Sequence, residues 1–224
     1  LAAGLDRLAT SCHGRGDGLG DVLTLARHRR GPRQRAEAAL IAAASEQVVQ
    51  QPAVEPAAAR RLPDLGVTHR RTTISTVGWM PGLTRFVDEV DEPIRLAISL
   101  HAATDALRSK LMPVNDRYPL EEVLAECVRH VELRRRKVFI EYVMLAGVND
   151  SIAHAEALVK LLDRHAFKVN LIPYNPTGMY EGSSRGTIDS FKAVLDTARL
   201  PSTVRLTRGR DIAAACGQLA AKNA

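Results

Sequence analysis

Val138-Phe139-Ile140-Glu141-Tyr142-Val143-Met144 is the stretch that most restricts the fold of this 224-residue chain. Its residues are apolar at both alternating sets of positions, with Glu141 as the exception. A strand is apolar on both sides when both faces of a parallel sheet are covered. The stretch therefore predicts a buried strand of a parallel sheet.

Further strands and helices alternate along the chain on either side of this stretch. Strands are predicted at 72–77, 95–100, 169–172 and 203–206, and helices at 120–131, 151–162, 188–198 and in a short segment near Cys216. Repeated βα units imply right-handed crossovers and a parallel sheet. The predicted fold class is α/β, with a sheet that is either open or part of a barrel.

The helix predicted at 120–131 is amphipathic and includes one of the three cysteines. Its apolar residues recur at intervals of three and four, which places them on one face: Leu120, Val123, Leu124, Cys127, Val128 and Val131. Burial raises the pKa of a thiol and suppresses the reactive thiolate. Cys127 is therefore predicted to be a core residue and not a catalytic one.

Residues 1–65 differ from the rest of the chain. They are rich in Ala, Arg, Gly and Gln and show no apolar periodicity except for a helix predicted at 34–50. Gly16, Gly18 and Gly20 lack the preceding strand and following helix of a phosphate-binding loop. We interpret 1–65 as an irregular segment, for which an off-frame origin is one explanation, and 66–224 as the folded domain.

The composition restricts the partners and the location. Lys and Arg number 31 against 25 Asp and Glu, a net charge of +6 that favours a phosphate-bearing partner. Cys12, Cys127 and Cys216 are too widely spaced for a disulfide framework or a metal site. No apolar run approaches the ~18 residues that a membrane helix needs. We expect a monomeric cytoplasmic protein.

Polar residues follow the predicted strands at the edge where parallel barrels bind ligands. Ser75 lies near the end of one strand, Ser99 and His101 close the next, and Asn175 follows a third. Two hydroxyls, an imidazole and an amide could hold a nucleoside-type cofactor. For each residue alone, an ordinary strand-end hydrogen bond stays open as the alternative. For His101, a general base or a metal ligand is a further alternative.

Cys216 is surrounded by small residues, with Arg208 and Arg210 nearby. Cationic neighbours stabilise a thiolate, so a reactive cysteine is one interpretation. A structural thiol is the other.

Seven ordered strings over about two thirds of the chain are recognisable together. They are Ser75-Thr76-Val77-Gly78, Ser99-Leu100-His101-Ala102, Met112-Pro113-Val114-Asn115, Ile140-Glu141-Tyr142-Val143-Met144-Leu145, Val148-Asn149-Asp150, Asn170-Leu171-Ile172-Pro173-Tyr174-Asn175-Pro176 and Ala215-Cys216-Gly217-Gln218-Leu219. The chain thereby resembles the RlmN/Cfr family of radical-SAM methyltransferases, which act on 23S ribosomal RNA and, in some members, on tRNA.

The resemblance implies a partial, half TIM-like barrel and an enzyme that methylates an adenine ring carbon. It puts Ser75, Ser99, Leu100, His101 and Asn175 at positions that contact S-adenosylmethionine (SAM). Cys216 matches the cysteine that carries the methyl group to adenine. The family also uses a 4Fe-4S cluster held by a Cys-x-x-x-Cys-x-x-Cys motif.

The chain departs from the family in its N-terminal third. It contains no Cys-x-x-x-Cys-x-x-Cys motif and no Gly-Glu-Pro string, so its cysteines do not supply three cluster ligands. The expectation is a family member that is inactive as written. The alternative is a non-catalytic SAM- or RNA-binding remnant or a gene fragment.

Overall fold

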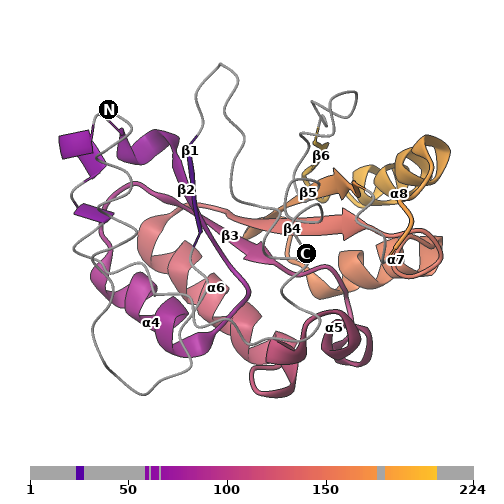
Figure 1. The fold of residues 1–224 in the computed structure, drawn as a ribbon, viewed down its shortest axis with the longest axis horizontal. Coiled ribbons are helices and arrows are strands. Elements are labelled where there is room, and N and C mark those ends of the chain that lie inside the picture. Colours follow the sequence, from indigo (N-terminus) through magenta and orange to yellow (C-terminus); the bar gives the residue numbers. More distant parts are fainter. Residues whose placement is uncertain (1–23, 28–58, 61, 66, 176–179, 206–224) are drawn as a thin grey trace, which may run out of the picture.

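A computed structural model describes residues 24–27, 59–60, 62–65, 67–175 and 180–205 of the chain (Figure 1). Most of the N-terminal segment predicted to be irregular, including the helix predicted at 34–50, lies outside these residues. So does the C-terminal segment that contains Cys216.

The described strands form one six-stranded sheet in sequential order. The last five strands pair in parallel, which confirms the predicted parallel sheet of βα units. The first strand pairs antiparallel with the second and was not predicted. The strands are β1 (Thr24–Arg27), β2 (Thr72–Thr76), β3 (Arg95–Ser99), β4 (Val138–Met144), β5 (Phe167–Pro173) and β6 (Ser202–Val204).

Helices connect the parallel strands and pack on one side of the sheet (Figure 1). Sequential strand order with crossovers of one hand puts every crossover helix on the same face. Helices α6, α7 and α8 were predicted, and α4 and α5 were not. The helices are α4 (Met80–Glu89), α5 (Asp105–Leu111), α6 (Leu120–Arg134), α7 (Ile152–Leu161) and α8 (Arg185–Thr197), with short 3-10 turns η2 (Leu62–Leu65), η3 (His69–Arg71) and η4 (Pro113–Asp116).

The core lies between the sheet and these helices. Ile98, Ile140 and Val169 are paired across β3, β4 and β5 and are fully buried. The ring of Phe191 from α8 contacts the ring of Tyr142, with centroids 5.4 Å apart. Burying such side chains stabilises the fold by roughly 1.5–3 kcal/mol each. We call this side of the sheet the covered face.

The amphipathic pattern of α6 is confirmed with one correction. Cys127 is fully buried, as predicted, but Val128 is 36% exposed. His130 is buried in its place, with its ring stacked on Phe86 of α4. At about 100° per residue, Val128 and His130 lie at opposite edges of the stripe, and α4 covers only one of those edges.

The other side of the sheet, the open face, holds the second set of alternating side chains. These are Thr73, Ser75, Ala97, Ser99, Phe139, Glu141, Lys168, Asn170 and Thr203. Side chains of paired residues in neighbouring strands point to the same face. The register therefore aligns Ser99, Glu141, Asn170 and Thr203 in one polar row across four strands.

Candidate functional site

Two predicted site residues, Ser75 and Ser99, lie on the open face on neighbouring strands. Ser75 is paired with Ala97, so it stands one side-chain level below Ser99. Ser99 is 8% exposed, and its hydroxyl makes no hydrogen bond with any described residue. The hydroxyl oxygen is not fully buried, so it can be reached by a hydrogen-bonding ligand at the end of β3.

Leu100 differs from its neighbours in the same string. Its side chain is fully buried in the core on the covered face, and its N–H donates to the Glu141 carbonyl at 3.0 Å. Any contact of Leu100 with a ligand on the open face would therefore be made by backbone atoms.

His101 has a left-handed backbone, with φ at 59°, and turns its ring toward β4. The N–H of Val143 donates to Nδ1 of the ring at 3.2 Å, which leaves the ring proton on Nε2. Burial, with Arg108 nearby, lowers the pKa of His101 to about 3. A neutral ring whose Nδ1 is already occupied argues against both the general base and the metal ligand. It retains one N–H donor at Nε2.

Asn149 joins the ends of β3 and β4 and was not predicted as a site residue. Its amide nitrogen donates to the carbonyls of His101 and Val143 at 2.9 and 2.7 Å. Its amide oxygen accepts from the N–H of Leu145 at 2.8 Å, and its side chain is fully buried. The string Val148-Asn149-Asp150 thus holds the strand ends that surround the candidate site.

Arg108 of helix α5 holds the ends of β2 and β3 together by hydrogen bonds to their backbone carbonyls. Its guanidinium donates to the carbonyl of Val77 at 2.6 Å and to Oδ1 of Asn115 at 2.8 Å, with a longer contact to the carbonyl of Ser99 at 3.4 Å. It is fully buried, and burial lowers its pKa to about 10. The string Met112-Pro113-Val114-Asn115 therefore supports the backbone of Ser99.

Asn175 lies two residues past the end of β5, at the same edge of the sheet as the ends of β2 and β3. It is 9% exposed and follows Tyr174, whose ring meets that of Tyr180 edge to face. The structure thus brings Ser75 and Ser99 to one face and puts His101 and Asn175 after strand ends.

Glu141 is a candidate site residue that sequence reasoning did not name, although it was noted as the polar exception in an apolar strand. The side-chain amide of Asn170 donates to its Oε2 at 2.8 Å, and Thr203 donates to Oδ1 of Asn170 at 3.3 Å. Burial raises the pKa of Glu141 to about 7, which the Asn170 hydrogen bond opposes. A carboxyl on a strand whose other residues are apolar was the signal that could have identified it.

Of the three cysteines, only Cys127 lies among the described residues. Cys127 is buried, and burial raises its thiol pKa well above the usual range, in agreement with its predicted structural role. Cys216 and Cys12 lie outside the described residues. Within those residues, no group of three His, Cys, Asp or Glu side chains could hold a metal ion.

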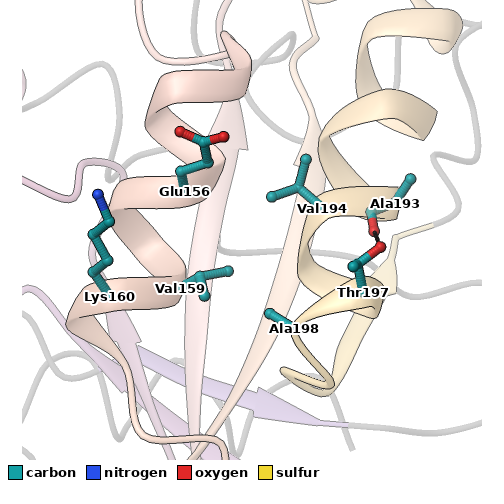
Figure 2. Close-up of a pocket in the computed structure, with 7 residues that line it drawn as sticks. All are labelled: Glu156, Val159, Lys160, Ala193, Val194, Thr197 and Ala198. Atoms are coloured by element: carbon teal, nitrogen blue, oxygen red, sulfur yellow. Dashed lines mark hydrogen bonds between the residues drawn. The ribbon is translucent and has the colours of Figure 1, made fainter.

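A groove between α7 and α8 lies on the solvent side of the helices (Figure 2). Val159 of α7 and Val194 of α8 point into it, and Glu156 and Lys160 lie along its rim. It contains none of the predicted site residues. None of the described helices is long and apolar enough to cross a membrane.

Comparisons with known proteins find relatives of part of this chain. A search of protein-family models found no match. The chain is 48% identical over 157 residues to the probable dual-specificity RNA methyltransferase RlmN of Moorella thermoacetica, covering 69% of this chain and 44% of the relative. The crystal structure of a radical SAM methyltransferase from Sphaerobacter thermophilus matches with a TM-score of 0.65 and 46% identity, covering 69% of this chain and 46% of that one.

The described residues form an α/β sheet whose fold matches part of the radical SAM methyltransferase structure. Over 69% of its length the chain is a homologue of RlmN. It spans just under half of the length of the relatives it matches.

Proposed function

We propose that this chain contributes the SAM-binding half-barrel of a radical SAM RNA methyltransferase. The observation that supports this most directly is the Ser99 hydroxyl, which has no hydrogen-bond partner among the described residues and lies at a strand end of a fold matched at 46% identity. The Ser99 hydroxyl and the Glu141 carboxyl on the open face, with the neutral His101 N–H beyond the end of β3, suit a nucleoside with hydroxyl and amino groups. These donors and acceptors fit SAM.

In this proposal, the five residues predicted from the resemblance bind SAM. Ser75 and Ser99 contribute hydroxyls, Leu100 backbone atoms, His101 its Nε2–H and Asn175 its amide. When bound, SAM supplies the methyl group. The chain's own residues bind and orient it and shield it from water on one side.

Cys216 is the proposed methyl carrier, and the proposed substrate is an adenine ring carbon of 23S ribosomal RNA or of tRNA. The net charge of +6 is consistent with an RNA partner in the cytoplasm. The 4Fe-4S cluster would have to be held by residues beyond those described. A cluster needs three thiolates, so we propose that this polypeptide alone does not methylate RNA.

A hybrid protein tests the role of Cys216. Residues 66–224 would be joined to a family N-terminal region that contains the three cluster cysteines. Mass spectrometry of the peptide with Cys216 should then show S-methylation, and the hybrid should methylate adenine. Cys127→Ala should retain both results, because Cys127 is a core thiol. An active hybrid in which Cys216→Ala still methylates RNA would refute the assignment.

Anaerobic reconstitution tests the cluster. The purified chain, given iron and sulfide, should not reach stoichiometric cluster absorbance. A full complement of cluster would show that Cys12 and Cys216, with other groups, form a site that the family motif does not predict. The non-catalytic SAM- or RNA-binding alternative is favoured if SAM binds and no cluster forms.

A further inference from the structure

Glu141 is a half-buried carboxyl on the open face that no charged group of the described residues neutralises. It forms no ion pair with any of them, which is also true of exposed carboxylates such as Glu121 and Glu156, but Glu141 differs from these in being largely desolvated. Removing a carboxylate from water without a cation is costly. A cationic group of a bound ligand could offset this cost.

Within the polar row, Glu141 receives a hydrogen bond only from the β5 side, at Oε2. Asn170 donates to Oε2 from β5, and Thr203 orients Asn170 in turn from β6. Oε1 accepts no hydrogen bond from a described residue. On the other side, in register on β3, lies Ser99, whose hydroxyl has no hydrogen-bond partner among the described residues. Oε1 of Glu141 and the hydroxyl of Ser99, neither of which is hydrogen-bonded to a described residue, thus lie on paired residues of neighbouring strands.

The cationic groups around Glu141 are engaged elsewhere or lie at other levels of the sheet. The Nζ of Lys168, one level below on β5, lies 5.7 Å from the centroid of the Phe139 ring. His101, beyond the end of β3, is neutral because its pKa is lowered to about 3. Arg205 follows β6 and by alternation lies one level above Thr203.

We propose that Glu141, held by Asn170, is the subsite of the open face that binds a positively charged group of the ligand. This rests on the proposed SAM-binding function and makes it more specific. SAM has two cationic groups, the sulfonium and the amino-acid ammonium. Either group could form an ion pair with the Glu141 carboxylate. Ligands that lack one or both cationic groups can tell the two apart.

The test is calorimetric titration of the full chain with three ligands. SAM has both cationic groups, S-adenosylhomocysteine has only the ammonium, and 5′-methylthioadenosine has neither while retaining the adenosine. Glu141→Gln preserves shape and removes the charge, and burial favours a neutral group, so the variant should fold. Glu156→Gln, an exposed carboxyl beside the groove of Figure 2, is the matched control.

Glu141→Gln should weaken SAM binding by roughly 10- to 100-fold, the range for a hydrogen bond to a charged group, and leave 5′-methylthioadenosine binding unchanged. S-adenosylhomocysteine identifies the cation: its binding falls with that of SAM if Glu141 pairs with the ammonium, and is unchanged if it pairs with the sulfonium. Glu156→Gln should change none of the three.

Two results would overturn the inference while leaving the proposed function intact. One is unchanged SAM binding in Glu141→Gln. The other is an equal loss for SAM and 5′-methylthioadenosine, which would place Glu141 against the ribose or the base. If the parent chain binds no SAM, the proposed function fails for this polypeptide, and the inference fails with it.

Discussion

The covered and open faces of the same sheet show opposite chemistry. Ile98, Ile140 and Val169 form a fully buried apolar row on the covered face. One residue further along each strand, Ser99, Glu141 and Asn170 form a polar row on the open face. The covered face therefore contributes most of the folding free energy, and the open face has the polar groups that could bind a ligand. Variants on the covered face should lose stability, and variants on the open face should lose ligand binding.

We expect the largest change in the free energy of unfolding between variants of two neighbouring residues on β4. Ile140 is fully buried on the covered face, and Phe139 is half-buried on the open face. Ile140→Ala should lower the free energy of unfolding by about 2–5 kcal/mol, because it removes core contacts and leaves a cavity. Phe139→Ala should cost clearly less, although phenylalanine is the larger side chain. Denaturant unfolding of both variants measures the difference.

Equal losses for Ile140→Ala and Phe139→Ala would break the comparison between the faces. They would show that the open face is packed as tightly as the covered one.

Asn149 tests whether the strand ends need its hydrogen bonds. Asn149→Ala should cost about 2–4 kcal/mol, because it leaves the carbonyls of His101 and Val143 and the N–H of Leu145 without partners in a buried place. Asn170→Ala, on the open face, is the comparison and should cost less, because it removes one hydrogen bond to Glu141 where Asn149→Ala removes three in a fully buried place. Similar costs for both amides, measured by denaturant unfolding, would contradict the role of Asn149.

His130 makes the stability of the covered side depend on pH. Burial, with Arg134 and Arg136 nearby, lowers its pKa to about 4 from 6.5. Between these values, the unfolded chain binds a proton that the folded chain does not. The contribution of His130 to stability should therefore be constant above about pH 6.5 and fall by up to about 3 kcal/mol as the pH drops toward 4. Glu141 contributes with the opposite sign, because its raised pKa lowers stability as the pH rises toward 7, so the His130 part is read from the difference between parent and variant. His130→Leu should remove this part of the acid loss, and an identical pH profile in the variant would refute it.

The sequence predicted the covered face well because burial leaves a periodic apolar pattern. The strand at 138–144 and the burial of Cys127 follow directly from such patterns. Helix α4 was missed because Met80-Pro81-Gly82 resembles a turn, although proline is well tolerated in the first turn of a helix. Helix α5 is seven residues long and its buried residue is Arg108, so it has no apolar stripe.

The open face was harder to predict because its pattern exists only in three dimensions. Ser99 and Asn175 were identifiable as strand-end residues, and the resemblance named them. The link between Glu141 and Asn170 joins residues 29 positions apart and depends on the register of β4 and β5. The same holds for Arg108, which reaches the carbonyl of Val77 across 31 positions. Neither contact has a local signature in the sequence.

SAM binding by the parent chain, compared with Ser99→Ala, tests the central claim most directly. Because the Ser99 hydroxyl has no partner among the described residues, its removal should not destabilise the fold. Ser190→Ala, on the exposed side of α8, is the control. We predict that calorimetry will show SAM binding by the parent and by Ser190→Ala, and binding weaker by roughly 1–3 kcal/mol in Ser99→Ala. Unchanged affinity in a folded Ser99→Ala variant would contradict the assignment of the open face as the SAM site.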